Sequence, residues 1–267
     1  MGRRARTLLL VLATGMAAGF LSGLFGVGGG LVIVPALRTL LGMDQRRAVA
    51  TSLAAIVVTA AVGACTYATR GQVSLAACLL VGAGSLAGAQ LGTWLLRHLP
   101  HRLLPWIFVG FTLTVVVSQQ LRVPVRDAAL DLDVLRAAAL VAVGVVAGVL
   151  AGLVGVGGGS VVVPGLELVA GTGDLLARGT SLLVMVPTAL TGTWSNLRHG
   201  LVDPCTGVLV GAAAALAAPL GVHVAARVSP ATGSLMFSGF LVCVVLSMLV
   251  RERARHRDER PQTASRG

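Results

Sequence analysis

The chain has 267 residues, of which 55% are hydrophobic and 12% are charged, and its mean hydropathy is +0.88. A soluble domain carries about twice that charged fraction, so the composition excludes an ordinary soluble protein and indicates an integral membrane protein. The net charge of +11 does not indicate nucleic-acid binding, because arginines precede the first apolar run and follow the last one, as the positive-inside rule expects.

Ten apolar segments follow one another, and we expect each of them to be a helix. Two segments, about 31–43 and 160–171, are shorter than the roughly 20 residues that cross a bilayer. The others cover about 7–25, 48–68, 74–96, 103–121, 135–154, 178–197, 205–226 and 232–250. The sequence therefore predicts an all-α polytopic membrane protein with about 8 to 10 hydrophobic segments.

The second half of the chain repeats the first half without a gap. Gly19 aligns with Gly148 and Pro35 with Pro164, and the same offset holds to the last apolar segment. Such internal duplication is common in membrane transporters. We divide the chain into a first repeat at 1–121, a charged linker at 122–134, a second repeat at 135–250 and a basic tail at 251–267.

The placement of arginines distinguishes parallel from inverted repeats. If the first two segments return the chain to its starting side, Arg46, Arg97 and both basic termini share one side of the membrane. If those segments cross once, Arg46 and Arg97 move to the other side, against the positive-inside rule. We therefore predict two inverted repeats, each a broken or re-entrant helix hairpin plus three spanning helices, with both termini cytoplasmic.

A glycine motif occurs in both hairpins, as "GLFGVGGGLVIVP" at 23–35 and "GLVGVGGGSVVVP" at 152–164. A dinucleotide fingerprint would need Gly or Ala where the chain has Leu31 and Ser160, and a Walker loop would need a lysine. The motif instead suits a broken helix, because glycine accepts positive φ and the missing N–H of Pro35 or Pro164 costs little in the first turns.

Two inverted hairpins would point their tips at each other near the midplane. Unpaired amides and helix dipoles at such tips favour a small anion. The alternative is that the glycines only permit close helix packing. The candidate substrate-binding residues of the tips are Gly26, Gly28, Gly29, Gly30, Leu31, Gly155, Gly157, Gly158, Gly159 and Ser160.

Polar side chains downstream of the hairpins are further candidates. The hydroxyls of Thr51, Ser52, Thr180 and Ser181 could bind an oxyanion, or they could cap helices and bond to the preceding turn. The amide of Asn196 could line a pathway, or it could hold helices together.

The sequence has no pattern that indicates enzymatic chemistry. The four cysteines lack metal-ligand spacing, so we expect no catalytic residue, no metal and no cofactor. The acidic residues near the apolar segments lie at segment ends, which argues against a carboxylate proton relay. These residues are Asp44, Glu167, Asp174 and Asp203. The expected partners are a small anion and the lipid bilayer, and nucleic acid is not expected.

The doubled motif resembles the TauE/SafE family of membrane permeases. The resemblance rests on "GFLSGLFGVGGGLVIVPAL" with "AVATSLAAI", and on "GVLAGLVGVGGGSVVVPGL" with "ARGTSLLVM", and covers Gly15 to Val250. It implies a transporter of the bacterial cytoplasmic membrane, with relatives that export sulfite or organosulfonates such as sulfoacetate. We therefore expect a secondary transporter, an exporter of a sulfur oxyanion or organosulfonate; a passive anion channel, or a permease for another small anion, is the alternative.

Overall fold

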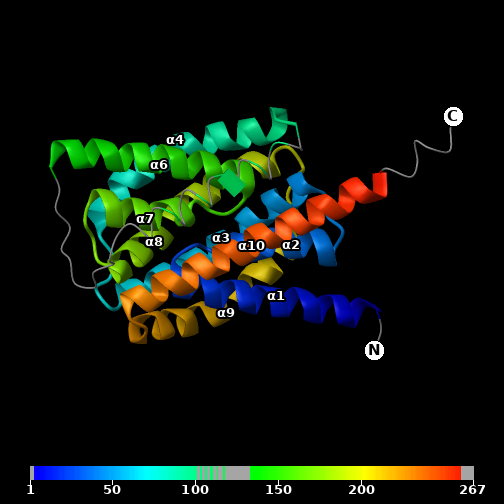
Figure 1. The fold of residues 1–267 in the computed structure, drawn as a ribbon, viewed down its shortest axis with the longest axis horizontal. Helices are drawn as coiled ribbons and strands as arrows, with labels where there is room; N and C mark the ends of the chain where they lie inside the picture. Colours follow the sequence, from blue (N-terminus) through cyan, green and yellow to red (C-terminus); the bar gives the residue numbers. More distant parts are fainter. Residues whose placement is uncertain are drawn as a thin grey trace.

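The computed structural model describes residues 3–100 and 133–259, together with residues 103, 106, 109, 110, 113 and 117 (Figure 1). The predicted segment 103–121 and the linker 122–134 lie mostly outside the described residues. The helices are α1 (Arg3–Phe25), α2 (Gly30–Leu40), α3 (Gln45–Ala68), α4 (Leu75–His98), α6 (Val134–Val154), α7 (Gly159–Val169), α8 (Asp174–Leu197), α9 (Pro204–Arg227) and α10 (Pro230–Glu259).

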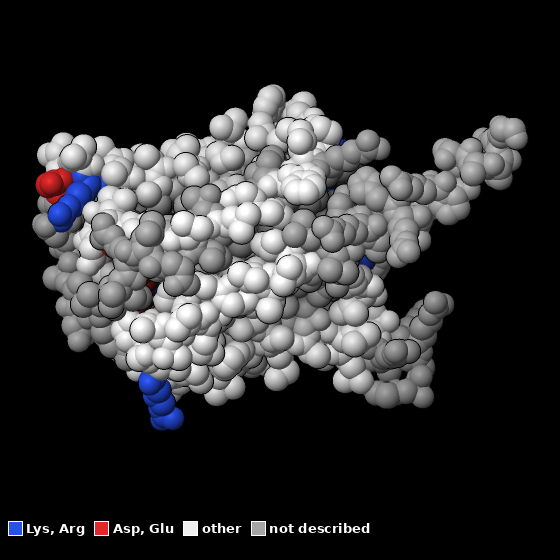
Figure 2. Space-filling view, in the orientation of Figure 1, with Lys and Arg blue, Asp and Glu red and all other residues white. Residues whose placement is uncertain are grey.

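The described part of the chain contains helices and no strand. Six helices, α1, α3, α4, α6, α8 and α9, are long and apolar enough to cross a membrane. Large apolar side chains cover their outer surface; Leu79 and Leu216, for example, are 74% and 79% exposed. Described charges lie toward the ends of the face in Figure 2, and the white middle carries almost none. The prediction of an all-α polytopic membrane protein is therefore confirmed.

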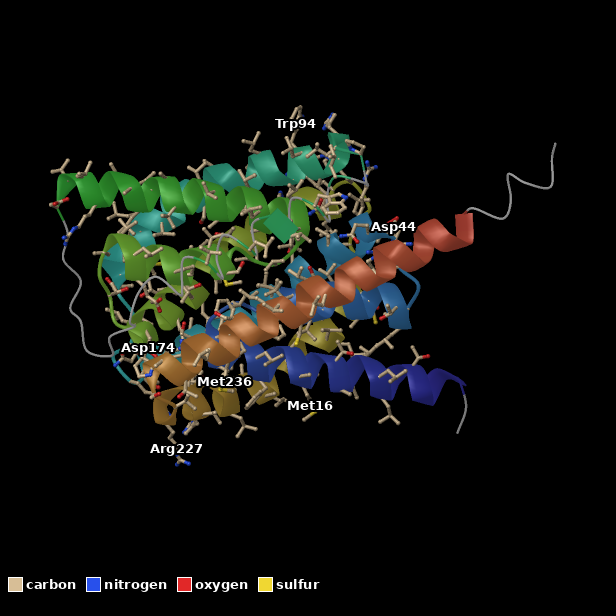
Figure 3. The ribbon with its side chains drawn as sticks, in the orientation of Figure 1. Met16, Asp44, Trp94, Asp174, Arg227 and Met236 are labelled. Carbon is tan, nitrogen blue, oxygen red and sulfur yellow. The ribbon has the colours of Figure 1, made fainter. Side chains whose placement is uncertain are left out.

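The two repeats run in opposite directions. In Figure 1, α1 runs from the N-terminus at the right toward the left, whereas α6 runs from left to right. Asp44 and Trp94 lie at the right end in Figure 3, while Asp174 and Arg227 lie at the left end. Both chain ends lie at the right. The fold therefore contains the predicted inverted pair of repeats, and the matching helices α3 and α8 pack against each other.

The first helix of each repeat packs against a helix of the other repeat, and small residues line the contact. A Cβ added at Gly19 of α1 would collide with the carbonyl of Ala214 in α9, and one at Gly148 of α6 would collide with the carbonyl of Ser85 in α4. Such close approach is the usual way in which helices associate in lipid, where burial of apolar surface gives little driving force. Small-residue packing therefore joins α1 to α9 and α4 to α6.

The short helices make the hairpins re-entrant. An 11-residue helix such as α2 rises about 16 Å, roughly half of the 30 Å hydrocarbon core. The chain consequently enters through α1, turns inside the protein and leaves through α2 on the side where it started, so that Asp44 lies at the same end as the N-terminus (Figure 3). Helices α6 and α7 form the matching hairpin, which enters from the opposite end (Figure 1).

Helices α8 and α10 are among those that extend beyond the predicted segments. Helix α8 begins at Asp174 rather than at residue 178, because Gly173 starts the helix and an acidic residue suits its positive end. Helix α10 continues through the start of the predicted tail to Glu259, in a stretch rich in arginine and glutamate, which are good helix formers.

Candidate functional site

The tips of the two hairpins have the same backbone conformation. Gly26, Gly28 and Gly29 have φ between 72° and 77°, and their counterparts Gly155, Gly157 and Gly158 have φ between 75° and 81°. In the described part of the chain, every residue with positive φ is glycine. A side chain at these positions would be strained, so the glycines are needed to turn the chain within such a short distance.

The two tips touch each other. A Cβ added at Gly30 would collide with the Gly155 carbonyl and lie 2.8 Å from Val156 Cα. A Cβ added at Gly159 would lie 2.5 Å from the Gly26 carbonyl oxygen and 2.8 Å from Val27 Cα. Gly30 and Gly159 therefore allow the opposed tips to meet backbone to backbone.

Two apolar side chains close the centre beside the tips. Ile56 of α3 and Met185 of α8 occupy the same repeat position, and neither has exposed surface. Both contact Gly28 of the first tip and Gly157 of the second. The arrangement in this structure is therefore a closed one, in which side chains and backbone fill the space between the tips.

The N-termini of α2 and α7 carry no side-chain caps. Gly29 and Gly158 are their N-cap residues, and neither helix has a capping hydrogen bond from a side chain. The first amides of an α-helix have no partner within the helix, so those of Gly30 and Gly159 depend on neighbours or a ligand. The next residues, Leu31 and Ser160, are both 3% exposed. Two buried positive helix ends consequently meet at the contact between the repeats.

The serine hydroxyls bind the tip of the opposite repeat. The Ser52 hydroxyl lies 2.8 Å from both the Gly155 carbonyl and the Val49 carbonyl of its own helix and is shared between them, and Ser181 donates to the Gly26 carbonyl at 2.9 Å. Both serines are fully buried. Each serine therefore holds the turn that belongs to the other half of the protein.

The neighbouring threonines make a second symmetric pair of cross-links. Thr51 accepts a hydrogen bond from the Asp203 amide at 3.0 Å, and Thr180 accepts one from the Ser74 amide at 2.9 Å. These amides stand at the N-caps of α9 and α4. The hydroxyl oxygens consequently join the repeats in this closed arrangement, and an anion would need the serine and threonine O–H groups to turn toward it.

The remaining predicted residues lie away from the tips. Asn196 lies roughly 16 Å along α8 from Met185, given 1.5 Å per residue. Its side chain is fully buried and has no hydrogen-bond partner within the described part of the chain. Pro35 and Pro164 lie inside α2 and α7, in the second turn. The structure thus brings the predicted glycines of the two tips together with Ser52 and Ser181, whereas Thr51 and Thr180 bind the starts of α9 and α4.

A buried ion pair was not expected from the sequence. Arg178 and Asp174 are 5% and 1% exposed, and the Arg178 Nη2 lies 3.3 Å from the Asp174 Oδ2. The Arg178 Nη1 donates to the Leu24 carbonyl at 2.8 Å, next to the first tip. Asp174 is at a helix end as predicted, yet that end is inside the protein. The alignment of the two repeats could have indicated this burial, because Arg178 occupies the position at which the first repeat has the apolar residue Val49.

The described residues contain no cluster of three or more histidine, cysteine or acidic side chains that could hold a metal. The four cysteines, Cys65, Cys78, Cys205 and Cys243, are free thiols. The chemistry that the site offers is therefore hydrogen bonding from amides and hydroxyls, with one buried guanidinium beside them.

Known proteins similar to this chain carry the name of probable membrane transporters. The family model described as "Sulfite exporter TauE/SafE" matches residues 1–118 and 140–267. The "Probable membrane transporter protein YdhB" of Bacillus subtilis is 26% identical over 73% of this chain and 81% of its own length. A "Probable membrane transporter protein" of Haemophilus influenzae is 26% identical over 91% of this chain and 98% of its own length. No solved structure matches the chain. With both inverted halves covered by one family model, the chain belongs to the TauE/SafE family of membrane transporters.

Proposed function

We propose that this protein is a secondary transporter that exports a small anion, most readily a sulfur oxyanion or an organosulfonate. The observation that carries the proposal is the meeting of two uncapped, buried helix N-termini, those of α2 and α7, at the contact between inverted repeats. Helix N-termini bind anions through free amides and the helix dipole. The family name supports the sulfur oxyanion.

The anion binds between the tips after they separate. The proposed ligands are the amides near Gly28 to Leu31 and Gly157 to Ser160, with Ser52 and Ser181 turning toward the anion as they release the opposite carbonyls. The inverted repeats then exchange roles, so that the site opens to one side and then to the other. The positive-inside rule favours both termini in the cytoplasm of a bacterial cell.

The contact between the tips favours a carrier over a passive channel. Ile56 and Met185 are fully buried between the tips and reach both of them, so an anion binds there only if the tips move. A channel would need an arrangement in which the centre is open to both sides at once. This second candidate function is retained because the same inverted hairpins would serve a pore.

Flux through the purified protein in proteoliposomes tests the proposal. Sulfite, sulfate, thiosulfate, sulfoacetate and small carboxylates are offered one at a time, and empty liposomes are the control. We expect saturable flux of one or more sulfur anions and counterflow from preloaded vesicles. Single-channel currents would show that the protein is a channel and not a carrier. The absence of flux for every anion would contradict the proposed function.

A further inference from the structure

Arg178 stands out by its charge and burial. Among residues whose side chains are described, it is the one buried cation, and Asp174 is the one buried carboxylate. Charges within a membrane protein are costly and usually mark a functional pathway. The matching residues of the first repeat are Val49 and Gln45, so that repeat forms the same hairpin contacts without a charged pair.

The guanidinium of Arg178 is in contact with the first hairpin. Its Nη1 donates to the carbonyl of Leu24, in the last turn of α1, at 2.8 Å. A Cβ added at Gly26 of the tip would lie 2.7 Å from Arg178 Cα. The neighbouring carbonyl of Gly23 accepts a 2.8 Å hydrogen bond from the hydroxyl of Tyr67. Arg178 is therefore attached to the base of the hairpin whose tip forms the proposed anion site.

The same guanidinium borders a cleft at the end of the molecule that lies away from both chain termini. Asp174 lies at this end in Figure 3. A Cβ added at Gly233 of α10 would lie 2.7 Å from Arg178 Nη2, so the glycine leaves room beside the charge. The cleft is lined by Phe25, Val163, Glu167, Asp174, Arg178, Pro230, Gly233, Ser234 and Phe237.

The contact of Arg178 with Asp174 is longer than its hydrogen bond to the Leu24 carbonyl. At 3.3 Å it is longer than a typical charge-assisted hydrogen bond of 2.7–2.9 Å, and it joins neighbouring turns of one helix. A guanidinium has five N–H donors in a planar fork that fits two oxygens of a carboxylate or sulfonate. An oxyanion that reaches the cleft therefore offers Arg178 a better-shaped partner than Asp174 does.

We propose that Arg178 is a substrate-binding residue for the anion at the cleft, and that Asp174 occupies it as a gate until an anion takes its place. This inference rests on the proposed function and adds a second binding position to it. When the anion replaces Asp174, it binds a side chain that also holds Leu24. Binding in the cleft is thereby linked to the first hairpin, whose tip is the position before the cleft on an export path.

Kinetics of three variants test the role of Arg178. Asp174→Asn removes the competing carboxylate, so the anion concentration at half-maximal flux falls. We expect a fall of about tenfold, which corresponds to the free energy of one charge-assisted hydrogen bond. Arg178→Gln raises that concentration about tenfold or more. Arg178→Lys keeps the charge without the planar fork, and its value lies between those of the wild type and Arg178→Gln. Arg70→Gln, at an exposed arginine in the turn after α3, is the matched control and leaves the value unchanged.

A binding measurement that does not depend on flux accompanies the kinetics. Sulfoacetate raises the melting temperature of the detergent-purified wild type, raises that of Asp174→Asn more, and raises that of Arg178→Gln least. If Arg178 only caps α1, its variants lower stability and maximal flux while half-saturation stays at the wild-type value, and the inference is overturned. If the wild type transports none of the anions offered and shows no shift with them, the proposed function has failed instead.

Discussion

Replacing Gly159 with alanine probes the backbone contact between the tips without changing backbone strain. Gly159 is the first residue of α7, and its φ is not in the positive range. The added Cβ would lie 2.5 Å from the Gly26 carbonyl oxygen, 2.8 Å from Val27 Cα and 2.9 Å from Met185 Sδ. Non-bonded carbon contacts are most favourable at about 3.5–4.0 Å, so the tips must separate by about 1 Å.

Gly82→Ala is the matched control for Gly159→Ala. Gly82 is a helical glycine of α4, and a Cβ added there would have no neighbour within 4 Å. Gly82 lies in a helix interior, where alanine gains up to about 1 kcal/mol of helix propensity, whereas Gly159 is the first residue of its helix and gains less. With about 1–3 kcal/mol of overpacking at the tip, we expect Gly159→Ala to be less stable than Gly82→Ala by about 1–4 kcal/mol.

The assay is the free energy of unfolding in mixed micelles, followed by flux in proteoliposomes at matched protein density. We expect Gly159→Ala to insert into the membrane and to show reduced flux, because its tips cannot close fully. If Gly159→Ala matches Gly82→Ala in both stability and flux, the tips do not meet as described.

Three other perturbations test separate parts of the fold. Ser181→Ala leaves the buried Gly26 carbonyl without its 2.9 Å donor and should lower the free energy of unfolding by about 1–3 kcal/mol, whereas Thr39→Ala, at an exposed hydroxyl, should change it little. Gly148→Ala should lower the melting temperature and the yield of folded protein, because its Cβ would collide with the Ser85 carbonyl; a wild-type melting temperature would contradict the packing of α4 on α6. Combined replacement by alanine of the four free cysteines, Cys65, Cys78, Cys205 and Cys243, should leave flux intact. A loss of flux would show that a thiol is required.

The hairpins could be predicted from the sequence because their physical requirements restrict residue type. A turn with positive φ at Gly26, Gly28 and Gly29 needs glycine, and a second copy of the motif makes coincidence improbable. The alternative, close packing, also holds within the motif, because a Cβ added at Gly23 would collide with the Ala218 carbonyl and one at Gly30 with the Gly155 carbonyl. Arginine placement predicted the inversion because it depends on membrane sidedness rather than on contacts within the fold.

The contacts that complete the site could not be predicted, because they join distant parts of the chain. Ser52 meets a carbonyl 103 positions away, and Arg178 meets one 154 positions away. The sequence suggested that Ser52 could bind an anion, cap a helix or bond to the preceding turn. Its Oγ does lie 2.8 Å from the Val49 carbonyl in the preceding turn, and the contact with Gly155 across the repeats is a further role. Ile56 and Met185 were missed for another reason, since one apolar residue among many carries no pattern that marks it as central.

The central claim, that an anion binds between the tips, is tested by cross-linking Ile56→Cys to Met185→Cys with a short bifunctional methanethiosulfonate on a background without the native cysteines. The native side chains at both positions reach Gly28 and Gly157 between the closed tips, and neither change adds an atom to the tip backbone. Sulfoacetate is the preferred probe among the sulfur anions, because sulfite cleaves disulfides. The account predicts rapid cross-linking without the anion and slower cross-linking as the anion saturates its site. Equal rates with and without a saturating, transported anion would contradict it.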